Sequence, residues 1–205
     1  MSADITLPGV FYFLPALAVF SGLSVNLILQ CGFSLKEITL TDAGVPGRKK
    51  EMFAELGVIF ISVILLWLFF SFTRSVFPLG LFEYILLFPV SCLLFSFLDN
   101  VTKTYILKLR DGIKNQILGG EVLTSAALFI TLNITGGISG AAVTAFGFTL
   151  GIAVAFFIIG GIRRRSAMEA VPGFLKGGPL ALISMGLLSL VFSSVAVVLY
   201  KFLEG

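Results

Sequence analysis

Long runs of apolar residues, separated by short polar stretches, dominate this chain. A transmembrane helix needs about 20 mostly apolar residues, because the hydrocarbon core of a bilayer is roughly 30 Å thick. Five segments meet this requirement: Val10–Gln30, Phe53–Phe72, Leu79–Leu98, Ile138–Ile162 and Pro179–Tyr200. A sixth, Asp111–Asn133, is weaker, because its apolar part, Val122–Leu132, is too short to span alone. The pattern predicts an all-α polytopic membrane protein.

The lysine and arginine residues indicate how many of these segments cross the membrane. Three groups of four follow the first, third and fifth segments: 36, 48, 49 and 50; 103, 108, 110 and 114; and 163, 164, 165 and 176. If the weak segment also crosses, the opposite side holds only Arg74 and Lys201. Because basic residues concentrate on the cytoplasmic side, the distribution predicts six crossings with both termini outside the cytoplasm.

Composition then narrows the chemistry. Hydrophobic residues make up 58% and charged residues 12% of the 205 residues, against about 45–50% and about 25% in soluble domains. These values exclude a soluble globule, a disordered chain and a nucleic-acid-binding protein. The chain has no histidine and two cysteines, which excludes imidazole catalysis and a four-thiolate metal site within one chain. We expect a single integral domain, residues 1–205, surrounded by membrane lipid.

Six crossings divide into two sets of three, approximately residues 8–100 and 104–203. With three crossings each, the second half must insert inverted relative to the first, and inverted repeats often have interrupted helices at corresponding positions. The first helix of each half carries such an interruption. Gly22-Leu23-Ser24 with Asn26 interrupts one, and Gly119-Gly120-Glu121 interrupts the other. Two unrelated kinks remain the alternative, because no residue-level repeat is visible.

Cys31 is the candidate metal ligand, at the end of the first segment in Gln30-Cys31-Gly32-Phe33. A thiolate binds iron and other soft metals, although a buried apolar cysteine is the commoner state. Cys92 lies inside an apolar segment, and we interpret it as a packing residue. Glu121 is the deepest ionisable residue near the membrane, which makes it a functional candidate or a partner for Lys114. None of these residues forms a recognisable catalytic arrangement.

The C-terminal third carries three motifs that resemble one membrane family. They are Gly147-Phe148-Thr149-Leu150-Gly151, Val171-Pro172-Gly173-Phe174-Leu175-Lys176-Gly177, and the run from Ala181 to Phe192. Together with Asn26–Phe33 and Leu132-Asn133-Ile134, they resemble the RnfA/NqrE (RsxA) proteins. These proteins are membrane subunits of the Rnf and Nqr ion-translocating electron-transport complexes.

The resemblance implies a role in relaying electrons across a prokaryotic cytoplasmic (inner) membrane. In the family, an intramembrane [2Fe–2S] cluster is shared with a paired RnfE/NqrD-like subunit, and other subunits carry flavin and iron–sulfur groups. The chain would then be a non-catalytic subunit of a translocase of the ferredoxin:NAD or NADH:quinone oxidoreductase type. Cys31 matches the first cluster ligand of the family. The second ligand position falls on Thr124, nine residues before Asn133, where a hydroxyl replaces the thiolate.

This departure from the family leaves three interpretations open. The cluster is atypical and completed by the partner, or it is lost, or the chain is a divergent subunit kept for structure or ion conduction. A hydroxyl is a poor ligand for iron compared with a thiolate. The membrane subunit of a small-molecule transporter is the alternative from another class. It is disfavoured because the chain has few buried polar residues with which to bind a substrate.

Overall fold

The computed structural model describes residues 7–30, 32, 48–76, 80, 82–106, 119–168 and 178–204. Every regular element in these residues is a helix, which confirms the all-α prediction for this part of the chain. In chain order the elements are α1 (Leu7–Val19), the π-helical turn η1 (Phe20–Ser24), α3 (Arg48–Val76), α4 (Phe82–Val101), the π-helical turn η2 (Thr102–Ile106), α5 (Gly120–Ile134), α6 (Ile138–Met168) and α7 (Gly178–Glu204).

Four of the helical stretches are long and apolar enough to cross a membrane: Lys50–Val76, Phe82–Tyr105, Ile138–Ile162 and Pro179–Leu199. Two further apolar stretches, Phe13–Ser24 and Gly120–Ile134, are shorter. At about 1.5 Å per residue, α5 rises about 22 Å, which is less than the roughly 30 Å of a hydrocarbon core. The two short helices are those in which the sequence predicts interruptions.

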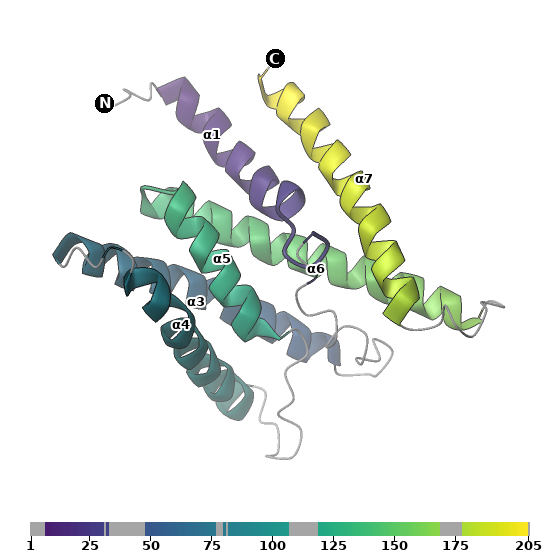
Figure 1. The fold of residues 1–205 in the computed structure, drawn as a ribbon, viewed down its shortest axis with the longest axis horizontal. Helices are drawn as coiled ribbons and strands as arrows, with labels where there is room; N and C mark the ends of the chain where they lie inside the picture. The colour runs from purple at the N-terminus through teal and green to yellow at the C-terminus, as the bar shows by residue number, and fades with distance from the viewer. Residues whose placement is uncertain are drawn as a thin grey trace.

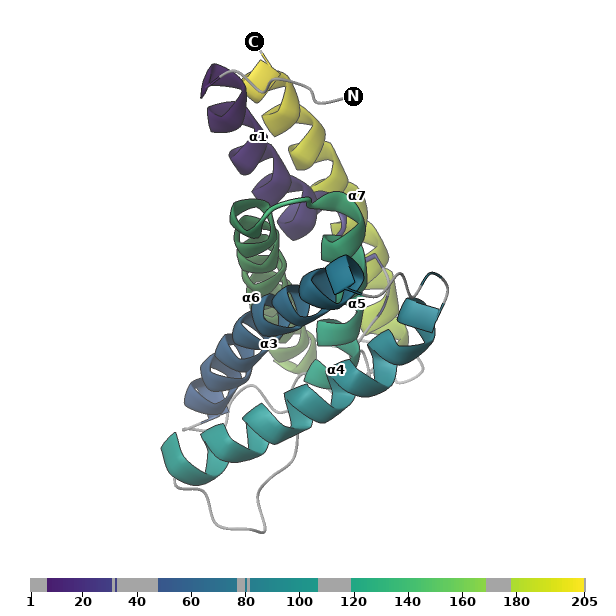
Figure 2. The same cartoon turned by 90° about the vertical axis from the view of Figure 1, so that its left-hand side faces the viewer.

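The long helices α3 and α6 pack against each other in the middle of the molecule, with α1 and α7 on one side and α4 on the other (Figure 1, Figure 2). The short helices are exchanged between the two halves of the chain. Helix α1 packs against α6 and α7, whereas α5 packs against α3 and α4. Each short helix therefore rests on the two long helices of the other half, so the two halves make corresponding contacts.

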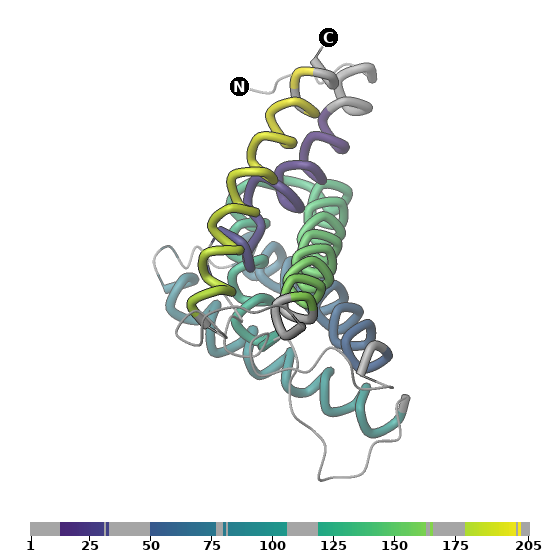
Figure 3. Tube along the Cα trace, turned by 90° about the vertical axis from the view of Figure 1, so that its right-hand side faces the viewer, coloured from purple at the N-terminus to yellow at the C-terminus, as the bar shows by residue number. Residues whose placement is uncertain are grey.

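The beginning of α1 and the end of α7 lie at the same end of the molecule (Figure 1, Figure 2). Between them, α1 and α7 run beside each other along α6 (Figure 3). The outer faces of α4 and α7 are rich in exposed apolar side chains, among them Leu93 and Phe97 on α4 and Leu190 and Val198 on α7. Such faces are typical of helices that contact lipid, because lipid tails solvate apolar side chains.

Buried apolar side chains form two clusters. The larger one joins Leu27–Leu29, which follow η1, to Leu123 and Ala127 of α5 and to residues of α3, α6 and α7. The smaller one gathers α3 and α5 residues around Trp67 and Leu128. The residues that follow the break in α1 and the first turns of α5 thus belong to one buried core.

Candidate functional site

The first helix is interrupted where the sequence predicts it. Its hydrogen bonding widens into one π-helical turn, in which the N–H of Val25 donates to the carbonyl of Phe20 over 2.8 Å. Residues 25–30 then follow an irregular course, although Asn26–Leu29 are buried. Backbone polar groups inside a membrane protein need internal partners, because lipid supplies none.

The side chain of Asn26, which is 1% exposed, supplies several of these partners. Its Nδ2 donates to the carbonyls of Gly22 over 3.1 Å and Gly151 over 2.9 Å. Its Oδ1 accepts the N–H groups of Ile28 over 3.2 Å and Leu29 over 3.1 Å. Because Gly151 belongs to α6, one amide group ties the break in the first half to a helix of the second half.

Glycines allow the two backbones to come this close. A Cβ on Gly22 would lie 2.9 Å from the carbonyl oxygen of Gly147, and a Cβ on Gly147 would lie 2.7 Å from that of Ala18. A Cβ on Gly151 would collide with the carbonyl of Gly22. Small residues at a helix crossing permit this approach in membranes, and here they bring α6 within reach of the Asn26 amide.

The second short helix also begins at the glycines that the sequence singles out. Gly119 has φ 57° and ψ 46°, a left-handed conformation that favours glycine. Gly120 lies against the ring of Phe95 in α4, where any Cβ would collide with the ring. Phe95 is itself fully buried. The start of α5 is thus fitted closely to α4.

Thr124, the predicted position of the second ligand, lies in the first turns of α5 and is fully buried. Its hydroxyl has no hydrogen-bond partner among the described residues. Two other α5 hydroxyls behave differently: Ser125 donates to the carbonyl of Glu121 over 2.8 Å, and Thr131 donates to that of Ala127 over 2.7 Å. The Thr124 oxygen is therefore not engaged by the helix that carries it.

A line of polar contacts joins α4 to α5. Three side-chain hydrogen bonds cross this interface: Tyr84 to Asn133 at 3.3 Å, Ser91 with Ser125 at 2.6 Å, and Ser96 to Glu121 at 2.5 Å.

Two ion pairs mark the two ends of α4. Arg74 of α3 meets Glu83 at 2.7 Å, and the arginine side chain is 46% exposed. Lys103 of η2 meets Asp99 at 2.8 Å, and both of these side chains are at most one-tenth exposed. Removing one partner of a buried pair leaves an uncompensated charge, whereas exposed pairs contribute little. Loss of one partner should therefore destabilise the protein more at the Asp99–Lys103 pair, at the C-terminal end of α4, than at the Arg74–Glu83 pair.

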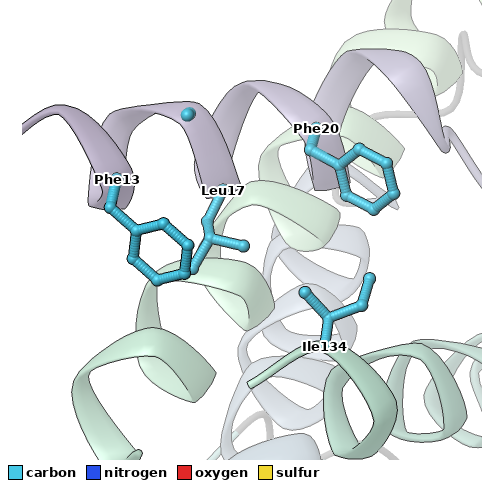
Figure 4. Close-up of a pocket in the computed structure, with 5 residues that line it drawn as sticks. Phe13, Leu17, Phe20 and Ile134 are labelled. Atoms are coloured by element: carbon cyan, nitrogen blue, oxygen red, sulfur yellow. The ribbon is translucent and has the colours of Figure 1, made fainter. Parts of the chain in front are cut away.

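Two pockets lie along α1, and both are apolar. One, of about 360 Å³, is lined by Phe13 and Leu17 of α1 and Phe20 of η1, which face Ile134 at the end of α5 (Figure 4). The other, of about 220 Å³, lies between the break and α6, beside Gly22 and Gly151. Neither pocket offers the charged or hydrogen-bonding side chains that recognition of a polar metabolite requires.

The sequence-predicted ligand positions have different outcomes. Cys31 lies outside the described residues, whereas Thr124 is placed in the core. Among the described residues, no group of three or more Cys, Asp or Glu side chains is placed to hold a metal ion. The described part of the chain therefore does not fit a [2Fe–2S] cluster by itself, since such a cluster needs four ligands and thiolates above all.

Sequence reasoning predicted none of these polar contacts, and two of them show why. Asp99 and Lys103 are four residues apart, a spacing that signals an ion pair on one helix face. The Ser91–Ser125 contact has no sequence signal, because the two residues are 34 positions apart and lie on separate helices.

Comparison with known proteins adds no relative. No family profile matches this chain, and no characterised protein matches it in sequence.

Proposed function

We propose that this chain is a membrane subunit of an ion-translocating oxidoreductase complex of the Rnf/Nqr type, similar to the RnfA/NqrE subunits. The observation that carries the proposal is the exchange of the two short helices between the halves of the bundle. One short helix leads toward Cys31 and the other carries Thr124, and both interrupted segments contribute to one buried core. The resemblance to the family implies one cluster ligand on each of these two interrupted helices.

The proposal includes six crossings in two inverted halves, with both termini outside the cytoplasm of a prokaryote. The corresponding contacts of α1 and α5 support the inverted halves. The shared end for the start of α1 and the end of α7 supports an even number of crossings. The three groups of basic residues support the orientation.

In this proposal the chain supplies part of a shared site. Cys31 provides a thiolate, and a paired RnfE/NqrD-like subunit provides the remaining thiolates of a [2Fe–2S] cluster. Such a cluster passes single electrons between the flavin and iron–sulfur subunits on the two sides of the membrane. The role of this chain is to bury the site, exclude water from it and hold the Cys31 segment in place.

A subunit without a cluster is the second candidate, and one observation favours it. The residue at the second ligand position is Thr124, and its buried hydroxyl is a hard oxygen donor unsuited to iron–sulfur chemistry. In that case the chain serves assembly or ion conduction in the same complex.

The test is to isolate the tagged chain gently from its native membranes and to measure its partners, iron and EPR signal. We expect a paired membrane subunit and an iron signal that Cys31→Ser abolishes and the matched variant Cys92→Ser keeps. Thr124→Cys should strengthen iron retention if position 124 faces the cluster. An unchanged signal in Cys31→Ser would favour the second candidate. Recovery of the chain as a lone, iron-free protein would reject both.

A further inference from the structure

Residues 25–30, which follow η1, belong to no regular helix. Within this segment, Asn26–Leu29 are almost fully enclosed. Unpaired N–H and carbonyl groups here would each carry a penalty, because they are removed from water. Something must therefore hold this segment in a defined course.

Asn26 has the only kind of side chain that can make all four observed contacts. Its NH₂ group donates twice, to Gly22 and Gly151, and its oxygen accepts twice, from Ile28 and Leu29. An aspartate keeps the two acceptor contacts but lacks a donor, and an apolar side chain loses all four. The amide therefore does two separate things: it shapes the turn and it binds the turn to α6.

The turn that the Asn26 amide holds also fixes the backbone of the residues on both sides of Cys31. The N–H of Gln30 donates to the carbonyl of Asn26 over 2.9 Å, and the N–H of Gly32 donates to that of Ile28 over 3.1 Å. Gly32 has φ +68°, a left-handed conformation in which the chain can change direction. A continuous series of hydrogen bonds thus runs from α6, through Asn26, to Gln30 and Gly32.

We propose that Asn26 is a positioning residue, which sets the course of the Cys31 segment by fastening it to α6. Its relevance to electron transfer rests on the proposed function, but its effect on the segment does not. The second half of the protein then controls how the first half presents its thiol. A substitution of Gly151 in α6 should therefore change the alkylation rate of Cys31, although the two residues need not be in contact.

The first experiment measures hydrogen–deuterium exchange and thiol alkylation on the full-length chain in nanodiscs. A Cys92→Ser background leaves Cys31 as the only thiol. We expect Asn26→Asp to speed amide exchange at Ile28 and Leu29, and alkylation of Cys31, by about tenfold, because the buried hydrogen bonds to Gly22 and to Gly151 of α6 are lost. The matched variant Asn133→Asp, at an exposed asparagine, should leave both rates unchanged. Equal rates in Asn26→Asp and the parent protein would overturn the proposal.

A second pair of variants keeps the proposal testable if Asn26→Asp does not accumulate. Gly151→Ala adds a Cβ that collides with the Gly22 carbonyl and lies 3.0 Å from Asn26 Nδ2, so it disturbs the same contact without replacing Asn26. A Cβ on Gly161 of the same helix meets nothing within 4 Å. We expect faster Cys31 alkylation in Gly151→Ala only. If amide exchange rises but Cys31 alkylation does not, Asn26 is structural and not a positioning residue. Neither measurement needs iron. An iron-free complex would reject the proposed function, whereas this inference would still be decided by the exchange and alkylation rates.

Discussion

The two interrupted segments occupy corresponding places in the fold but are built in opposite ways. The break after α1 is closed mainly by backbone contacts. Glycines bring α6 close, and Asn26 forms hydrogen bonds with carbonyl and N–H groups of the break and of α6. The start of α5 is held by side chains instead. There, the Phe95 ring covers Gly120, and serine and glutamate contacts cross to α4.

This difference shows where each segment can tolerate change. A backbone-to-backbone contact has no freedom to adjust, whereas a ring or a hydroxyl can move to another rotamer. The closely fitted segment is the one that leads to Cys31, and the more adaptable one carries Thr124. We infer that the two sides of the candidate site differ in rigidity as well as in ligand chemistry.

Gly147→Ala tests the backbone contact between α1 and α6, and it should have the largest effect on stability. The new Cβ would collide with the Ser21 hydroxyl and would also lie 2.7 Å from the carbonyl oxygen of Ala18. Because that carbonyl is backbone, α1 and α6 must separate, and we expect a loss of about 2–3 kcal/mol of stability. Thermal unfolding in detergent measures the loss, with Gly161→Ala as the control. Similar melting temperatures for the two variants would show that the α1–α6 contact is not close.

Gly120→Ala tests the other side. The added Cβ collides with the Phe95 ring, and we expect a loss of about 1–2 kcal/mol because a side chain can yield. Adding Phe95→Leu should recover part of this loss, since it removes the ring edge. A double variant that is no more stable than the sum of its single changes would contradict the side-chain explanation. No single truncation of a side chain should rescue Gly147→Ala in this way.

The Ser91–Ser125 contact tests the side-chain contacts between α4 and α5, with a smaller expected loss of stability. Ser125→Ala and Ser91→Ala should each cost about 1 kcal/mol, and the double variant should lose less than the sum because the two hydroxyls share one bond. Chemical or thermal unfolding of the four proteins of the cycle gives the coupling. Strict additivity would mean that the 2.6 Å contact contributes nothing.

Thr124→Val should have the smallest effect. Its hydroxyl has no partner among the described residues, so replacement by an isosteric apolar group should change the stability of the isolated chain by less than about 0.5 kcal/mol or increase it. Thr131→Val, which removes the bond to Ala127, should be the more destabilising of the pair. The reverse order would reveal that the Thr124 oxygen has a partner after all.

Much of the helical framework is predictable from the chain because apolar runs and glycines act locally. The sequence-predicted segment Ile138–Ile162 lies within α6 (Ile138–Met168), and Pro179–Tyr200 lies within α7 (Gly178–Glu204). The interruption at Gly22–Asn26 is confirmed, and α5 begins at the Gly119-Gly120 pair that the sequence singles out, since these residues disrupt helices by their own chemistry. The six crossings, the orientation and Cys31 as a ligand stay predictions.

The candidate site shows the limit of such reasoning. Asn26 is visible in the sequence as a polar residue in an apolar run, but its partner Gly151 is 125 residues away. The same sequence distance hides why Gly147 and Gly151 are glycines: they meet the break of α1, and not a neighbour in α6. No local periodicity encodes which of several small-residue stripes meets which helix.

By itself, the sequence determined that this protein is helical and apolar, that its first helix is interrupted near residues 22–26 and that a helix begins at residues 119–120, because helix length, hydropathy and glycine act within a few residues. Only the tertiary structure decided that each short helix packs on the other half of the chain. It also decided that Asn26 fastens one break to α6 while the Thr124 hydroxyl stays unengaged by the described residues. Those outcomes depend on which backbones come within hydrogen-bonding distance, and only the packed bundle sets that distance.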